Sequence, residues 1–88
     1  MIILMMRTKM AQEIHLTNIP LDLVEEHDSG AIKEYKATID EIYMDSLGNP
    51  YQVVINYNGK SRRVTPKFDD GVITFRYRRF RYEGFVSQ

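Results

Sequence analysis

Cysteine and tryptophan are absent from the 88 residues, and proline and glycine are scarce, with three and five residues. Without cysteine the chain can form neither a disulfide nor a thiolate zinc site, which are the usual stabilisers of small secreted domains. We therefore expect a reducing compartment and a cytoplasmic protein. We also expect one domain, residues 1–88, with a thin core, because a domain of this size buries only about 60–65% of its unfolded surface.

Long apolar runs are also missing. The longest, Met1–Met6, has six residues, far fewer than the roughly 20 that span a membrane. It precedes the basic residues, whereas a signal peptide has the opposite order and a longer apolar core. We expect no targeting signal and no membrane partner. Residues 1–10 are expected to be either a short strand docked on the core or a flexible start, and the methionines in this stretch leave the start codon open.

Residues typical of catalysis and metal binding are few and scattered. His15 and His27 are the only histidines, and neither has a metal-binding spacing to another ligand. Asp69 and Asp70 precede Gly71 and are explained by a turn. The glycines form no phosphate-binding loop, and no serine lies in a nucleophile motif. We predict no enzymatic activity, no catalytic residues, no metal and no cofactor.

Alternation of apolar and polar residues predicts a mainly β fold. The clearest element is residues 51–65, where Asn58-Gly59 separates two alternating runs and predicts a two-residue hairpin turn. Such a turn places Tyr57 opposite Lys60. Residues 13–18 alternate as a short strand, and "FDDG" at 68–71 predicts a further turn. One short helix is expected before residue 30, with Pro20 in its first turn.

Residues 31–47 fit two structures. One set of apolar residues recurs at helical spacing: Ile32, Tyr35, Ile39, Ile42 and Tyr43. Within the same stretch, Tyr35, Ala37 and Ile39 alternate with polar residues as in a strand, and "DSLGNPY" is rich in turn formers. We favour a strand from about Glu34 to Met44 and keep the helix as the alternative.

The stretch "VITFRYRRFRYEGF", residues 72–85, mixes four arginines with five aromatic rings. Its alternation slips by one residue at Arg78-Arg79, which predicts a β-bulge within one long bent strand. The bulge would keep one set of side chains in the core: Ile73, Phe75, Tyr77, Phe80 and Tyr82. The sequence as a whole predicts a small, strongly bent antiparallel sheet or barrel of about five strands, with one short N-terminal helix.

The formal net charge is zero, but it is unevenly distributed. Residues 1–44 hold four Lys/Arg and eight Asp/Glu, a net of −4, and residues 45–88 hold eight Lys/Arg and four Asp/Glu, a net of +4. Arginine binds phosphate and stacks on bases, and tyrosine adds stacking surface. We therefore predict a non-catalytic module that binds nucleic acid or a protein partner. Its binding residues would be Lys60, Arg62, Arg63, Lys67, Arg76, Arg78, Arg79 and Arg81.

Residues 34–66, "EYKATIDEIYMDSLGNPYQVVINYNGKSRRVTP", resemble the Tudor-type small β-barrel. The resemblance rests on an aromatic residue followed by an alanine, a Tyr-x-Val strand, and a tyrosine before a glycine turn: Tyr35, Ala37, Ile39, Tyr51, Val53, Tyr57, Gly59 and Val64. In that family, rings at strand ends form a cage for methylated side chains through cation–π attraction. The resemblance implies cage positions at Tyr35, Tyr43 and Tyr57.

The charge split also suits a different function. A small cysteine-free chain with an acidic half is similar in size and charge to phage or mobile-element proteins that bind and inhibit a host defence protein. In that alternative, carboxylates mimic the phosphates of nucleic acid: Asp22, Glu25, Glu26, Asp40 and Glu41. A third possibility is a homo-oligomer formed by pairing of edge strands.

Overall fold

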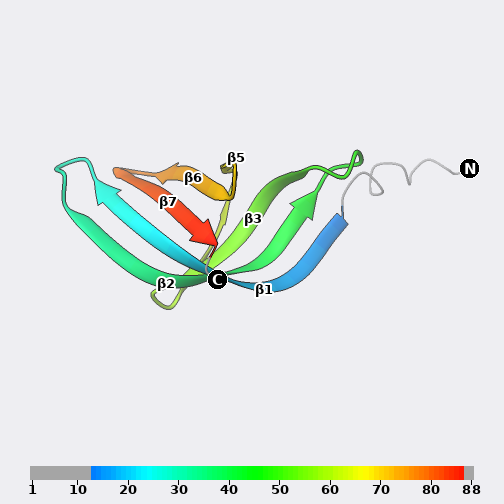
Figure 1. Ribbon diagram of the computed structural model, residues 1–88, viewed down its shortest axis with the longest axis horizontal. Helices are drawn as coiled ribbons and strands as arrows, with labels where there is room; N and C mark the ends of the chain where they lie inside the picture. Colours follow the sequence, from blue (N-terminus) through cyan, green and yellow to red (C-terminus); the bar gives the residue numbers. More distant parts are fainter. Residues whose placement is uncertain (1–12, 87–88) are drawn as a thin grey trace, which may run out of the picture.

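The computed structural model describes residues 13–86, which form one antiparallel sheet of seven strands (Figure 1). The strands are β1 (Glu13–His27), β2 (Ile32–Met44), β3 (Pro50–Tyr57), β4 (Lys60–Val64), β5 (Lys67–Asp69), β6 (Val72–Tyr77) and β7 (Phe80–Val86). Their order across the sheet is β4-β3-β2-β1-β7-β6-β5. The mainly β class is confirmed, whereas the predicted count of five strands is wrong. Residues 1–10, for which we expected a docked strand or a flexible start, lie outside the described part.

Chain connectivity forces this sheet to curl. β4 and β5 are its two edge strands, yet only Thr65 and Pro66 separate them in the sequence. Three Cα–Cα steps of about 3.8 Å join Val64 to Lys67, so these strand ends lie within roughly 11 Å of each other. In a flat sheet with strands about 4.8 Å apart, the two edges would be roughly 29 Å apart. No pairing joins β4 to β5 in residues 13–86, so the result is a curled, open sheet and not a closed barrel.

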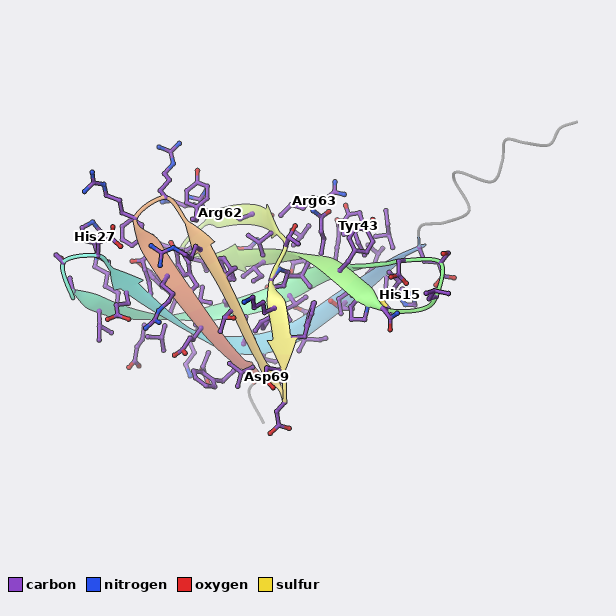
Figure 2. All side chains as sticks on the ribbon, turned by 90° about the horizontal axis from the view of Figure 1, so that it is seen from above. His15, His27, Tyr43, Arg62, Arg63 and Asp69 are labelled. Atoms are coloured by element: carbon purple, nitrogen blue, oxygen red, sulfur yellow. The ribbon has the colours of Figure 1, made fainter. Side chains whose placement is uncertain are left out.

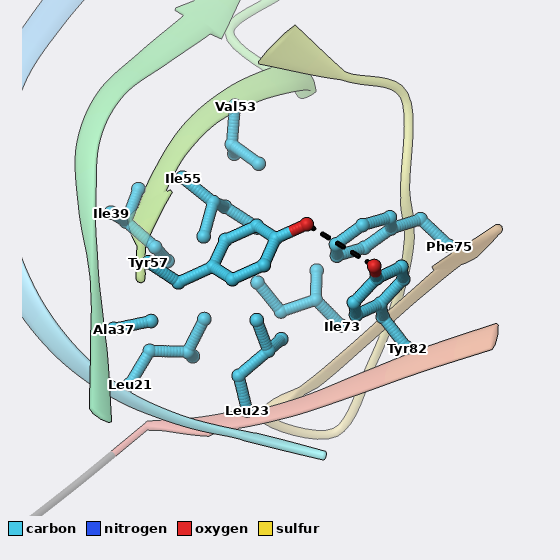
Figure 3. Packing of buried hydrophobic residues seen from close by; sticks show 10 residues of the cluster. All are labelled: Leu21, Leu23, Ala37, Ile39, Val53, Ile55, Tyr57, Ile73, Phe75 and Tyr82. Atoms are coloured by element: carbon cyan, nitrogen blue, oxygen red, sulfur yellow. Dashed lines mark hydrogen bonds between the residues drawn. The ribbon is translucent and has the colours of Figure 1, made fainter. Parts of the chain in front are cut away.

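The core fills the inside of the curl (Figure 3). Ten side chains are buried there: Leu21, Leu23, Ala37, Ile39, Val53, Ile55, Tyr57, Ile73, Phe75 and Tyr82. They stand at every second position of their strands, because alternate side chains of a strand point to the same face. Tyr77 and Phe80 pack against this cluster while remaining partly exposed. The predicted inward face of residues 72–82 is therefore confirmed.

The predicted N-terminal helix is wrong, because its residues lie in the middle of β1. Leu21 and Leu23 alternate inward, and this part of the strand pairs with β2 on one side and β7 on the other. Along the sequence, the pairing of β1 with β7 begins at Leu21, and Pro20 comes one residue before it. Within residues 13–86, Pro20 has a partner in β2 only, and proline is tolerated where its missing N–H breaks no hydrogen bond of the ladder. Pairing on two sides overrides the local helix signals.

The predicted bulge at Arg78-Arg79 is also wrong. These two residues form a tight turn between β6 and β7, with Tyr77 paired to Phe80. This turn divides the single predicted strand into two, and β5 adds a further short strand. Register shifts occur instead in β1, between residues 16 and 19, and in β2, between residues 39 and 41 and between residues 43 and 44.

The register shift in β2 explains why residues 31–47 fitted two structures. Tyr35 and Ile39 lie toward the inside of the curl, and after the shift Ile42 also packs on the core. One extra residue in the strand thus produces a three-residue spacing that resembles a helix. The favoured strand, about Glu34 to Met44, is confirmed, and the helical alternative is wrong.

The hairpin at Asn58-Gly59 has the predicted register, with Tyr57 opposite Lys60. Both central residues have positive φ, 50° for Asn58 and 72° for Gly59. Asp70 and Gly71, in the predicted "FDDG" turn, have the same pattern, with φ of 52° and 83°. Asparagine, aspartate and glycine accept this backbone region more readily than other residues, so these two turns follow from local chemistry.

Gly84 of β7 leaves space that the core fills with Leu21. A Cβ at Gly84 would lie 2.9 Å from Leu21 Cδ2 and 3.1 Å from its Cγ. We expect Gly84→Ala to lower the free energy of unfolding by about 1–3 kcal/mol through overpacking, measured by urea denaturation. Leu21→Val removes both δ methyl groups, so Gly84→Ala should cost less in that background. An equal cost in both backgrounds would contradict this packing.

Candidate functional site

A groove of about 550 Å³ opens at one end of the curled sheet, next to the β3–β4 and β6–β7 turns. Five aromatic rings line it: Tyr35, Tyr57, Tyr77, Phe80 and Tyr82. Four basic side chains line it as well: Lys33, Lys60, Arg62 and Arg78. Glu25 is the one carboxylate among the described residues that line this groove. The rings stand on inward positions near strand ends, so the aromatic end of the core also forms the wall of the groove.

A chain of hydrogen bonds crosses the base of the groove. From β4, Arg62 Nε donates to the hydroxyl of Tyr57 at 2.9 Å. Tyr57 donates to the hydroxyl of Tyr82 at 3.2 Å (Figure 3). Tyr82 donates to Glu25 Oε2 at 2.7 Å, and Tyr35 donates to Glu25 Oε1 at 3.2 Å. The five residues come from β4, β3, β7, β1 and β2. We call this set the tyrosine–glutamate chain.

Two phenols of this chain have raised pKa values. Burial, followed by hydrogen bonds to Tyr57 and Glu25, raises the pKa of Tyr82 well above its ordinary range. Burial, followed by the charge of Glu25, also raises the pKa of Tyr35. Both environments therefore favour the neutral phenol, which is the form that donates a hydrogen bond to the carboxylate.

Tyr77 lies at the end of β6, and two guanidinium groups lie close to its ring. Arg62 places its Cζ 3.9 Å from the ring centroid, and Arg78 places its Cζ at 5.2 Å. Hydrogen bonding to Arg78, then to Arg62, lowers the pKa of the Tyr77 phenol. Arg62 reaches from β4 to β6, which are far apart in the strand order but face each other across the curl. A cation–π contact thus spans the gap between the two sides of the sheet.

Arg78 occupies a strained backbone position. Its φ is 58°, in the left-handed region where a side chain other than glycine, asparagine or aspartate is unfavourable by about 1–2 kcal/mol. The corresponding positions of the other two tight turns are taken by Asn58 and Asp70. The β6–β7 turn therefore presents an exposed arginine where local chemistry favours a small polar residue.

The predicted basic residues do not form one stripe. Lys60, Arg62 and Arg78 line the groove. Arg63 lies on the opposite face of β4 from Arg62 (Figure 2), where its Cζ is 4.0 Å from the Tyr43 ring centroid. Its Nε donates to Gln52 Oε1 at 2.8 Å. Adjacent residues of a strand point to opposite faces, and this separates the two arginines.

The remaining predicted cations face the outside of the curl or lie in the turn. Arg76 and Arg81 are register partners, and Lys67 lines a shallow hollow with them. Arg76 forms an ion pair with Asp28 at 3.3 Å, and Arg81 forms one with Glu26 at 2.7 Å. These pairs join the basic and acidic halves of the chain, but they are exposed and stabilise the fold little. Arg79 is exposed in the β6–β7 turn.

The five predicted acidic residues also lie on different faces. Glu25 faces the groove, and Glu26 pairs with Arg81 outside it. Asp22 forms an ion pair with Lys36 at 2.8 Å. The last two accept hydroxyl hydrogen bonds from their own strand: Asp40 from Thr38 at 2.8 Å, and Glu41 from Tyr43 at 2.9 Å.

The three tyrosines implied by the Tudor resemblance do not meet. Tyr35 and Tyr57 lie in the groove with ring centroids 5.4 Å apart. Tyr43 lies elsewhere, with its ring 6.5 Å from that of Tyr51 and beneath Arg63. The sequence did not indicate that Lys33, Tyr77, Phe80 and Tyr82 line this groove. The positions of the three aromatic residues could have indicated this, because inward-facing rings close to a hairpin turn must lie at an end of the curl.

A second hollow, of about 410 Å³ and largely apolar, lies between the outer half of β1–β2 and the β5–β6 turn. Among the described residues, the part of β1 before Leu21 pairs with β2, and the pairing with β7 covers residues 21–27. Homo-oligomerisation by edge-strand pairing stays a prediction.

Within residues 13–86, no group of three or more His, Cys, Asp and Glu side chains is arranged to hold a metal ion. His15 contacts Glu13 at 3.3 Å, and His27 contacts Ser29 at 2.9 Å (Figure 2). The described residues also include no helix long and apolar enough to cross a membrane. Comparisons with models of protein families, with curated proteins and with solved structures found no match to this chain.

The raised pKa of Tyr82 makes stability fall at alkaline pH. An unfolded tyrosine ionises near pH 10, whereas folded Tyr82 keeps its proton there, so ionisation favours the unfolded chain. This contribution to stability is complete below about pH 10 and is lost as the pH rises. We expect the urea midpoint to fall between pH 9 and pH 11, and to fall less in Tyr82→Phe.

Tyr77→Phe is the matched control, because the pKa of Tyr77 is shifted in the opposite direction. Tyr77 ionises at a lower pH in the folded chain than in the unfolded chain, so its contribution to the free energy of unfolding increases as the pH rises toward 10. Removing its hydroxyl should make the alkaline decline steeper. An unchanged decline in Tyr82→Phe would contradict the assigned environment of that phenol.

Proposed function

We propose that this chain is a non-catalytic module that binds single-stranded nucleic acid in the groove at the end of its curled sheet. The observation that carries the proposal is the meeting of five rings and four cationic side chains in one groove. Single-stranded nucleic acid presents the complementary groups, which are flat bases and regularly spaced phosphates. Unpaired bases can stack on aromatic rings, whereas the bases of a duplex are already stacked on each other.

Each kind of side chain has a distinct role in this proposal. Lys33, Lys60 and Arg78, close to the turns, bind phosphates, and these contacts release counterions from the strand. Tyr77 and Phe80 offer ring surface, and stacking of a base on such a ring contributes about 1–3 kcal/mol. Arg62 holds Tyr77 in place from the opposite side of the sheet. Arg63 and the outward pair Arg76 and Arg81 lie outside the groove.

The turn residue Arg78 gives independent support. A residue held in an unfavourable backbone region persists only where the surrounding structure determines it, and such residues are common at functional sites. Hairpin turns of this length favour glycine or asparagine. In our proposal the arginine is retained because its guanidinium binds a phosphate at the rim of the groove.

No observation favours nucleic-acid mimicry as a second function. Glu25 faces the groove, whereas Asp22 and Glu26 lie on the outer face of β1 and already pair with basic side chains. A mimic needs a regular row of exposed negative charge, which these positions do not provide.

The direct test is fluorescence anisotropy with a labelled 12-nucleotide single strand over a range of salt concentrations. With about three phosphate contacts, log K should fall with log salt at a slope of roughly −2. The same strand annealed to its complement should bind more weakly, because its bases are no longer free to stack. Absence of binding at low salt, or stronger binding of the duplex, would refute the proposal.

Arg78→Gly should separate binding from stability. Glycine adopts a φ of 58° without strain, so the variant should be at least as stable as the original chain in urea. Its affinity for the single strand should fall about fivefold to tenfold, and the salt slope should lose roughly 0.7, the value for one phosphate contact. Arg63→Ala is the matched control, because it removes one positive charge from the opposite face of β4. An equal loss of affinity in both variants would show that net charge, and not the groove, controls binding.

A further inference from the structure

Glu25 stands out in a groove that is otherwise basic. A carboxylate repels phosphate, so its presence among four cationic side chains calls for a different role. Glu25 lies at the base of the groove, on β1, and it is partly buried. The base of the groove is the place where a nucleobase, and not a phosphate, would reach if the phosphates remain at the rim.

The hydrogen bonds of Glu25 leave part of its acceptor capacity unused. A carboxylate has two oxygens with about four acceptor positions in all. Tyr82 donates to Oε2 and Tyr35 donates to Oε1, so each oxygen has received one donor. One position on each oxygen is still available. The two hydroxyls, which come from β7 and β2, also fix the plane of the carboxylate.

Two adjacent acceptors in a fixed plane match a ligand with two parallel N–H donors. Among the bases, guanine alone has this arrangement on its Watson–Crick edge, with N1–H beside the N2 amino group. Adenine and cytosine place one amino group beside a ring acceptor, and uracil and thymine place one N–H between two carbonyls. Charge-assisted bidentate pairs of this kind are stronger than single neutral hydrogen bonds.

We infer that the groove prefers guanine, with Glu25 accepting hydrogen bonds from N1–H and the N2 amino group of an unstacked base. This inference rests on the proposed binding of single-stranded nucleic acid, and it adds which base the site selects. Tyr82 and Tyr35 act as positioning residues, because their hydroxyls hold the carboxylate in place. The rings around them supply the stacking surface that any base would use.

The test uses the full chain and four labelled 12-nucleotide thymidine strands that differ at one central position. That position carries guanine, 7-deazaguanine, hypoxanthine or adenine. Guanine and 7-deazaguanine have the same Watson–Crick edge and should bind equally. Hypoxanthine lacks the N2 amino group and should bind more weakly. Adenine should bind at least fivefold more weakly than guanine, the lower end of what a bidentate base contact contributes.

Variants of Glu25 test whether this side chain causes the preference for guanine. Glu25→Gln replaces one acceptor by a donor, so the ratio of guanine to adenine affinity should fall toward one. Glu25→Asp keeps the charge but withdraws it by one methylene, and it should lower the ratio as well. Glu83→Gln is the matched control, because Glu83 lies on β7 outside the groove and its loss should leave the ratio unchanged. Urea denaturation of each variant confirms that it is folded.

The possible results separate the two proposals. If no strand binds at low salt, the proposed function fails, and this inference fails with it. If all four strands bind equally, or if Glu25→Gln keeps the preference, the inference fails while the proposed function stands. If free GMP displaces the guanine strand, the groove recognises the nucleotide alone. If the guanine strand is preferred but GMP does not displace it, the groove recognises guanine only within a strand. Stronger displacement by an arginine-containing peptide than by GMP would overturn the inference, because a guanidinium offers the same two donors.

Discussion

The tyrosine–glutamate chain is the interaction on which the rest of this structure depends. It runs from Arg62 through Tyr57 and Tyr82 to Glu25, with Tyr35 as a second donor to the carboxylate. Strand pairing leaves the sheet open between β4 and β5, so the two sides of the curl need another connection. This partly buried network supplies it, because hydrogen bonds are stronger in a region of lower dielectric constant and favour one arrangement of the strands.

The same side chains connect the fold to the proposed function. Toward the core, the rings of Tyr57 and Tyr82 pack with Phe75, whose ring is stacked on Tyr82 at 4.7 Å. Toward solvent, their hydroxyls orient Glu25 and Arg62, and Arg62 in turn covers Tyr77. The groove is therefore the polar end of the core and not a separate structure. A change that disturbs the network should alter stability and recognition together.

The sequence predicted the local features of the fold and missed those that depend on distant parts of the chain. Alternation and the Asn58-Gly59 turn are local, and the strand class and hairpin register they predicted are confirmed. The strand through Pro20 was missed because its pairing partners, β2 and β7, lie later in the chain. The turn at Arg78-Arg79 was missed because arginine is not a turn former, and a bulge accounts for the same slip in alternation.

The candidate site shows the same limits. That arginines and tyrosines act together was predicted from composition, but the face on which each arginine lies was not. Arg62 and Arg63 are neighbours in the sequence and lie on opposite faces of β4. Glu25 was grouped with the acidic residues of the first half, because its partners Tyr35 and Tyr82 are ten and 57 residues away. Such a network becomes visible only once the strand order is known.

The most direct test is the thermodynamic coupling between Arg62 and Glu25, the two ends of the tyrosine–glutamate chain. Arg62→Met and Glu25→Gln, measured singly and together by urea denaturation, form a double-mutant cycle between residues joined through two tyrosine hydroxyls. We predict a coupling above about 0.5 kcal/mol that disappears when the cycle is repeated in Tyr82→Phe, because that change breaks the connection. Effects that simply add in the original chain, or a coupling that persists without the Tyr82 hydroxyl, would contradict the central role of this network.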